Sequence, residues 1–166
     1  MSETAAARDL LIRFCHGDGV DLGFGGDKIK PSAIAMDQPR GYTKVGEDAV
    51  QLHGDARNLH WFKDGVLDYV YSSHLLEDFT LEETVPVMKE WTRVLKKSGR
   101  LILLLPDEPT YRAHCDKTGQ HYNQAHKIDY FGIDYVRGAA FQCNLKEIYY
   151  SGIINTYSFA VIFEKI

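Results

Sequence analysis

The fold of this chain is decided by the stretch Gly19-Val20-Asp21-Leu22-Gly23-Phe24-Gly25-Gly26-Asp27, which is followed by Ala33-Ile34-Ala35-Met36-Asp37. An apolar strand leads into a glycine turn, and a second apolar strand ends in a carboxylate. In a parallel α/β sheet, this arrangement binds a nucleoside-bearing cofactor: glycines allow the backbone to approach the ligand, and the carboxylate accepts hydrogen bonds from the ribose hydroxyls.

The glycine pattern argues against a dinucleotide. The dinucleotide fingerprint needs a third glycine where this chain has Lys28, and Asp37 follows Gly23 by 14 positions instead of the usual roughly 20 after the fingerprint. Asp21 would place a negative charge beside a pyrophosphate, whereas it suits a ligand that carries an ammonium group. S-adenosylmethionine fits these constraints, because it has an amino group, a ribose and a sulfonium cation but no phosphate.

Four motifs in order resemble those of the class I S-adenosylmethionine-dependent methyltransferases. The resemblance covers residues 17 to 106 well and the remainder loosely. The matching segments are Asp21 to Gly26 with Asp37, Leu52-His53-Gly54-Asp55-Ala56, Leu67 to Asp78, and Val94 to Leu103. The chain also resembles a compact subgroup, often associated with sugar and cell-envelope biosynthesis, in which the first crossover helix is reduced to a turn.

The resemblance implies a set of cofactor contacts at the carboxyl ends of the strands. The methionine part would lie near Asp21, Gly23 and Gly25, the ribose near Asp37, and the adenine near Asp55 and Ala56. The full expected set is Asp21, Gly23, Phe24, Gly25, Asp37, Gln38, Gly54, Asp55, Ala56, Ser72 and Ser73. The alternative is that these glycines and carboxylates serve only in turns and helix caps.

Candidate catalytic and acceptor residues follow the fourth and fifth strands. An imidazole suits general-base catalysis on a hydroxyl acceptor, so His74 is the candidate base, unless it only packs against the ligand. An acceptor pocket is expected from Tyr111, His121, Tyr122, Asn123 and His126, which could instead form an ordinary surface loop. Their spacing matches no standard zinc pattern, and no metal is expected.

Composition points to one cytoplasmic enzyme domain over residues 1–166. The chain is 45% hydrophobic and 25% charged, which is ordinary for a globular protein. A net charge of −4 argues against general nucleic-acid binding, no apolar run is long enough to span a membrane, and no signal peptide is apparent. Three cysteines without C-x-x-C spacing indicate free thiols.

The resemblance implies a Rossmann-like, doubly wound α/β sheet of mostly parallel strands in the order 3-2-1-4-5-7-6, with an antiparallel C-terminal hairpin. A short amphipathic helix is expected over 5–15, a capped helix from Thr80 that Gly99 ends, and another helix over 129–137. The expected strands are 20–23, 33–37, 50–53, 67–71, 100–105, 141–150 and 156–164.

The main hypothesis is an enzyme that transfers a methyl group to a small-molecule or saccharide acceptor. The alternative is a non-catalytic S-adenosylmethionine-binding partner subunit. A shortened first crossover and a short N-terminus leave little material to cover the cofactor, so a second copy of the chain or a partner subunit could supply that cover. A nucleotide-dependent oxidoreductase is a third hypothesis, which the missing third glycine opposes.

Overall fold

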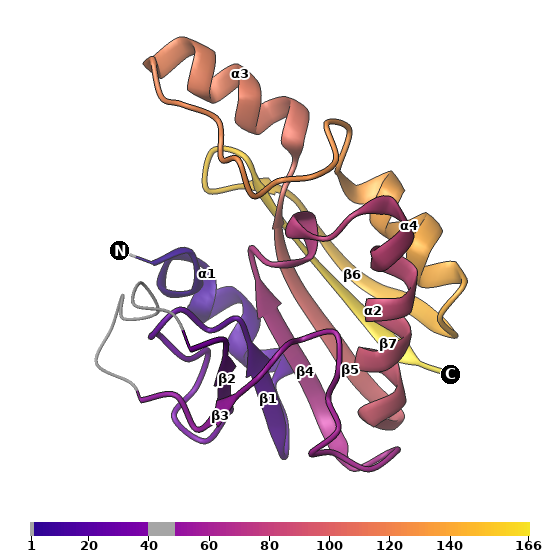
Figure 1. Ribbon diagram of the computed structural model, residues 1–166. Helices are drawn as coiled ribbons and strands as arrows, with labels where there is room; N and C mark the ends of the chain where they lie inside the picture. The colour runs from indigo at the N-terminus through magenta and orange to yellow at the C-terminus, as the bar shows by residue number, and fades with distance from the viewer. Residues whose placement is uncertain (1, 40–48) are drawn as a thin grey trace.

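The computed structural model describes residues 2–39 and 49–166 and shows seven strands in one mixed sheet (Figure 1). The strand order is β3-β2-β1-β4-β5-β7-β6, as predicted. Most of the loop expected over 38–48 lies outside the described residues. The strands are β1 (Gly19–Leu22), β2 (Ile34–Asp37), β3 (Leu52–His53), β4 (Leu67–Ser73), β5 (Leu95–Pro106), β6 (Leu145–Ile154) and β7 (Ser158–Lys165).

The first five strands are parallel to one another, and β7 runs antiparallel to both β5 and β6. The carboxyl ends of β1 to β5 therefore share one edge of the sheet. The helices are α1 (Glu3–Leu11), η1 (Ile12–Phe14), η2 (Leu76–Asp78), α2 (Leu81–Val94), α3 (Glu108–Thr118) and α4 (Ile133–Phe141). Figure 1 shows η2 and α3 at the edge where β4 and β5 end.

Helices α2 and α4 cover one face of the sheet. Met88 and Trp91 of α2, and Val136 of α4, are fully buried against the side chains of β4, β5 and β7 on that face. Thr80 and Glu83 form the predicted capping box, and Pro86 lies inside α2. Leu81, the first residue of α2, is 49% exposed.

The opposite face is covered by α1, although no helix joins β1 to β2. One buried cluster on this face includes Ala7 and Leu11 of α1, Ile29 of the β1–β2 connection, and Tyr69 and Tyr71 of β4. The shortened crossover is thus confirmed. The N-terminal helix supplies the cover that a crossover helix provides in an ordinary doubly wound sheet.

The predicted end of α2 at Gly99 is wrong. The helix ends at Val94, and β5 begins at Leu95 and reaches regular pairing with β4 only at Arg100. Ser98, with φ +61°, makes the left-handed turn. Gly99 is needed for close approach instead, because a Cβ there would lie 2.8 Å from the Lys96 carbonyl oxygen.

The C-terminal third also departs from the predicted bounds. Helix α3 was not predicted, since its sequence lacks a clear apolar stripe, and only Glu108 and Cys115 are buried. Helix α4 begins at Ile133 instead of residue 129 and includes Phe141. The antiparallel hairpin is confirmed, but β6 starts at Leu145 and continues to Ile154, so the turn consists of residues 155–157.

Candidate functional site

A cavity of about 310 Å³ opens at the carboxyl ends of β1, β2 and β3. In open α/β sheets, ligands bind at this edge, beside the point where the strand order reverses. The volume lies at the lower end of the range of about 300–1,000 Å³ that small-molecule sites occupy. Its lining residues are Gly23, Met36, Asp37, Gln38, Gly54, Asp55, Ala56, Arg57, Leu75, Asp78, Phe79, Glu83 and Lys127.

The turn after β1 has a backbone that favours glycine. Gly23, Gly25 and Gly26 have φ values of +65°, +61° and +97°, in the left-handed region. Gly23 also has no room for a side chain, because a Cβ there would lie 2.9 Å from Cδ2 of Leu75. The amide of Gly23 donates to the Met36 carbonyl oxygen at 2.9 Å. The turn is therefore held against the end of β2.

Asp37 joins the tips of β1 and β2. Its Oδ2 accepts from the Gly25 amide at 3.2 Å, and its Oδ1 accepts from the Gln38 amide at 2.7 Å. A carboxylate has about four lone-pair directions, so each oxygen keeps capacity for another donor. Since Asp37 also lines the cavity, it can accept hydrogen bonds from a ligand diol while holding the glycine turn in place.

The segment after β3 forms another wall of the cavity. Arg57 contacts the Asp55 carboxylate through Nε at 3.0 Å and Nη2 at 2.6 Å, and its Nη1 donates to Glu83 Oε1 at 2.7 Å. The Trp61 ring packs on Gly54, where an added Cβ would lie 2.0 Å from the ring and the ring would have to shift. Neither Arg57 nor the contact of Glu83 with it was predicted from the sequence. The close spacing of Asp55 and Arg57 was the available signal.

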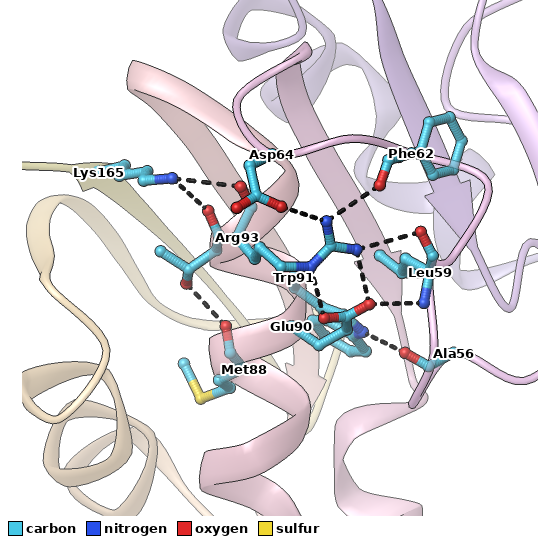
Figure 2. Close-up of polar contacts among 10 residues, drawn as sticks. Ala56, Leu59, Phe62, Asp64, Met88, Glu90, Trp91, Arg93 and Lys165 are labelled. Carbon is cyan, nitrogen blue, oxygen red and sulfur yellow. Dashed lines mark hydrogen bonds and ion pairs between the residues drawn. The ribbon is translucent and has the colours of Figure 1, made fainter.

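Side chains of helix α2 hold this segment by hydrogen bonds to its backbone (Figure 2). The Trp91 indole donates to the Ala56 carbonyl oxygen at 2.8 Å, and Glu90 Oε1 accepts from the Leu59 amide at 2.7 Å. Arg93 donates to the carbonyl oxygens of Phe62 at 3.0 Å and Leu59 at 3.2 Å. The adenine-side wall expected from the sequence is thus attached to the core through α2.

Six of the eleven expected cofactor residues line the cavity: Gly23, Asp37, Gln38, Gly54, Asp55 and Ala56. Asp21, Phe24, Gly25, Ser72 and Ser73 do not line it. Ser72 is fully buried, and its hydroxyl donates to the Leu22 carbonyl oxygen at 3.1 Å, so it links β4 to β1. Phe24 is also buried, and Ser73 ends β4. Other lining residues that we missed are Met36, Leu75, Asp78, Phe79 and Lys127.

Asp21 lies beneath the glycine turn, on the face that α1 covers. Its side chain is fully buried, and Oδ2 accepts from the Ile29 amide at 2.7 Å. No group among residues 2–39 and 49–166 donates a hydrogen bond to Oδ1. Burial raises the pKa of Asp21 to about 8. Alternation along β1 explains this position, because Val20 and Leu22 point to the other face.

His74 follows β4 and turns the chain, with φ +50° and its amide bonded to the Leu104 carbonyl oxygen at 2.8 Å. Its side chain is 19% exposed, and Nε2 lies 3.1 Å from the Ser158 hydroxyl. Burial lowers the pKa of His74, but contact with Glu77 and the charges of Glu77, Glu3 and Asp78 outweigh burial and raise it. His74 does not line the cavity, whereas its neighbour Leu75 does.

The expected acceptor residues separate into two groups. Tyr111, Asn123 and His126 lie together: the Tyr111 hydroxyl accepts from the Asn123 amide at 2.9 Å, and the rings of Tyr111 and His126 are 5.0 Å apart. His121 and Tyr122 are exposed, and Tyr122 bonds Asp116 on α3. None of these five residues lines the cavity at β1 to β3.

Among the described residues there is neither a helix suited to cross a membrane nor a side-chain cluster suited to bind a metal ion. No described helix has the length and apolarity needed to cross a membrane. In the part of the chain that the structure describes, no group of three or more histidine, cysteine, aspartate or glutamate side chains could hold a metal ion. The three cysteines are buried and unpaired as thiols.

The chain resembles known methyltransferase domains in part of its sequence and in its fold. Residues 26–103 match a family model described as a methyltransferase domain. A S-adenosylmethionine-dependent methyltransferase from Archaeoglobus fulgidus aligns with a TM-score of 0.77 at 16% identity, over 98% of this chain and 92% of that one. No curated protein matches the chain.

Two further structures bear on ligand and partner. The N-methyltransferase NodS from Bradyrhizobium japonicum, in complex with S-adenosylhomocysteine, aligns with a TM-score of 0.66 at 14% identity, over 95% of this chain and 85% of that one. A complex of the Haloferax volcanii Trm112 methyltransferase activator with a methyltransferase aligns with a TM-score of 0.66 at 15% identity, over 89% of this chain and 81% of that one.

Proposed function

We propose that the chain is a class I S-adenosylmethionine-dependent methyltransferase that transfers a methyl group to a small-molecule or sugar-linked acceptor; the methyltransferase-domain match over residues 26–103 and the shared fold support this proposal. S-adenosylmethionine is the cofactor of this family. Its site in this chain is the cavity at the ends of β1, β2 and β3. The observation that carries this proposal is the contact between the two strand tips, in which Asp37 Oδ2 accepts from the Gly25 amide at 3.2 Å.

The residues of the cavity fit the parts of the cofactor. Asp37 would accept from the ribose hydroxyls, and Gly23 would let the methionine part approach the backbone. Met36, Leu75 and Phe79 offer apolar surface for the adenine, whose edge would face Asp55 and Ala56. We place Asp21, Phe24, Gly25, Ser72 and Ser73 behind this layer, where they hold the turn and the strand ends in position.

The protein's contribution to the reaction is chiefly positioning. Bound in this cavity, S-adenosylmethionine supplies a methyl group whose bond to sulfur breaks, with the electron pair staying on sulfur, as an acceptor lone pair forms the new bond. Holding an acceptor on that line can lower the barrier by about 7–11 kcal/mol. For a hydroxyl acceptor, His74 would take the proton at Nε2, which adds about 10²–10⁴-fold to the rate.

Calorimetric titration of the whole chain with S-adenosylmethionine and with S-adenosylhomocysteine tests the cofactor assignment. We expect binding of both in the micromolar range. NADH serves as the competing ligand, because the oxidoreductase hypothesis requires a dinucleotide. Heat from NADH, with none from either adenosyl ligand, would overturn the proposal.

A non-catalytic cofactor-binding subunit is the second candidate. The absence of a helix between β1 and β2, together with the Trm112 complex among similar folds, favours it. Screening small-molecule and saccharide acceptors for formation of S-adenosylhomocysteine distinguishes the two. Turnover supports the enzyme, whereas cofactor binding without turnover, also after addition of cellular partners, supports the subunit.

A further inference from the structure

Glu77 of η2 is a buried carboxylate in an unusual environment. Its side chain is 1% exposed. Within residues 2–39 and 49–166, neither of its oxygens accepts a hydrogen bond. Burying a carboxylate is costly unless a nearby positive charge compensates for the lost water. The groups that lie close to the Glu77 carboxylate therefore indicate its role.

The groups nearest to the Glu77 carboxylate are two imidazoles. Oε1 lies 3.4 Å from His74 Nδ1 and 3.9 Å from His126 Nε2. His126 is already paired through Nδ1, which lies 2.6 Å from Glu108 Oε2. Arg112 also contacts Glu108, with Nε 2.9 Å from Oε1. Glu108 thus has two partners of its own, and of the two imidazoles His74 lies closer to the Glu77 carboxylate.

The Nε2 edge of the His74 imidazole faces polar groups of β7 and α1. Nε2 lies 3.1 Å from the Ser158 hydroxyl on β7 and 3.7 Å from Glu3 Oε2 on α1. The Tyr157 ring packs edge-on against the imidazole, with centroids 6.4 Å apart, and Asp78 of η2 adds a further negative charge. Nδ1 therefore lies toward a buried carboxylate, while Nε2 lies toward the Ser158 hydroxyl and Glu3.

We propose that Glu77 is the positioning residue for His74: it holds the imidazole with the Nδ1–H toward its carboxylate, so that Nε2, which contacts the Ser158 hydroxyl in this structure, is the nitrogen that accepts a proton from a hydroxyl acceptor. A carboxylate behind an imidazole fixes the tautomer and stabilises the cation that proton transfer produces. This inference rests on the proposed function, because it concerns the base of that reaction. The inference also adds detail to the proposed function, since a general base is needed when the acceptor is a hydroxyl.

The test follows the His74 ring by NMR in the full chain without any ligand. The signal is assigned by comparison with His74→Gln. Above its pKa, His74 is expected as the Nδ1–H tautomer. In Glu77→Gln, we expect that preference to be lost and the pKa of His74 to fall by about one pH unit or more. A neutral His74 that is mainly Nε2–H, or an unchanged pKa in Glu77→Gln, would overturn the proposal.

Two controls separate positioning from a purely structural role. Glu108→Gln disturbs the contacts of His126 and Arg112 but leaves the His74–Glu77 contact, so it should lower thermal stability and keep the tautomer of His74. Glu82→Gln changes an exposed carboxylate of α2 and should alter neither. If Glu77→Gln does not fold, Glu77→Asp is the second variant. Its side chain is one methylene shorter, so the carboxylate lies farther from His74, and the pKa of His74 should again fall. No shift there would also overturn the proposal.

Activity gives an independent readout once the acceptor screen yields a substrate. Glu77→Gln should lower kcat with little change in KM, and His74→Gln should lower turnover by about 10²–10⁴-fold. Full activity of both variants would contradict the inference. Since the NMR measurement needs no cofactor, its failure is distinguishable from failure of the proposed function, which the calorimetric titration reports.

Discussion

Two aspartates, Asp21 in β1 and Asp37 at the end of β2, illustrate how one residue type serves two purposes. Asp37 is half-buried, accepts two backbone amides and lines the cavity. Asp21, only two positions before the glycine turn, is fully buried and bonds the amide of Ile29. From the sequence, both aspartates were expected to contact the cofactor. The direction in which a side chain leaves its strand decides that only Asp37 reaches the cavity.

Replacing Asp37 should weaken cofactor binding. In Asp37→Ala, the ribose loses its charged acceptor and the Gly25 amide loses its partner, so we expect a loss of at least about 1.5–3 kcal/mol of binding free energy. Calorimetry with S-adenosylhomocysteine measures this. Asp9→Ala, an exposed carboxylate on α1, is the control. Unchanged affinity in Asp37→Ala would remove this residue from the site.

Replacing Asp21 should change how stability depends on pH. The native carboxyl keeps its proton up to about pH 8, whereas the unfolded chain releases it near its usual value of 3.8. The native state binds more protons between these values, so the free energy of unfolding contributed by Asp21 falls as the pH rises through this window. Asp21→Asn should flatten that decline and make the protein more stable above pH 8.

Urea denaturation at a series of pH values between 4 and 9 measures the effect of Asp21→Asn. The matched control is Asp134→Asn, whose carboxylate is 96% exposed on α4 and should leave the pH dependence as in the wild type. The same slope in Asp21→Asn and in the wild type would show that Asp21 titrates normally in the folded protein.

At the scale of elements, α2 does more than cover the sheet. Its Trp91 and Glu90 bond the backbone that follows β3, and its first turn places Glu83 against Arg57 at the cavity. The capping box was readable from Thr80 and Glu83 because both partners are local in sequence. The contact of Glu83 with Arg57 could not be predicted from the sequence, because Arg57 is 26 positions away and approaches Glu83 only in the folded chain.

Trp91→Phe should affect both stability and binding. The change leaves the buried Ala56 carbonyl oxygen without its donor, which costs about 1–3 kcal/mol. Because Ala56 lines the cavity, we also expect weaker binding of S-adenosylhomocysteine. Urea denaturation and calorimetry measure the two effects. Tyr130→Phe, at a ring that is 61% exposed, should change neither. Wild-type stability in Trp91→Phe would argue that this hydrogen bond does not support the wall.

At the scale of the whole molecule, the N-terminal helix compensates for the missing crossover. Leu11 is fully buried in the cluster that Ile29, Tyr69 and Tyr71 form on that face. Without α1, this half of the sheet would expose apolar side chains of β4 and β5 to water. The Rossmann-like order is therefore retained with a different helix in the covering position.

Leu11→Ala tests this role of α1. Deleting a buried leucine side chain costs about 2–5 kcal/mol through lost burial and the cavity that remains. Thermal and urea denaturation should both show the loss. Leu81→Ala, at a side chain that is 49% exposed, should cost much less. Equal stabilities of the two variants would mean that α1 does not act as a structural layer of the domain.

The sequence alone determined the strand order, the shortened first crossover, the capping box of α2 and the C-terminal hairpin. The crossover, the capping box and the hairpin depend on local signals: apolar runs, turn glycines and cap residues that lie within a few positions of one another. The strand order was implied by the resemblance to the methyltransferases. It also determined the residues at the strand ends that resemble a methyltransferase site, because parallel strands bring their carboxyl ends to one edge.

Only the tertiary structure decided which of these residues reach the cavity and which lie behind it. It also decided that α3 is helical despite a weak pattern, and that Glu77, His74 and His126 meet. These residues come from separate segments, and the contacts between them depend on side-chain direction and on how loops pack back onto the sheet. The physical reason is that burial and long-range contact have no counterpart in local sequence spacing.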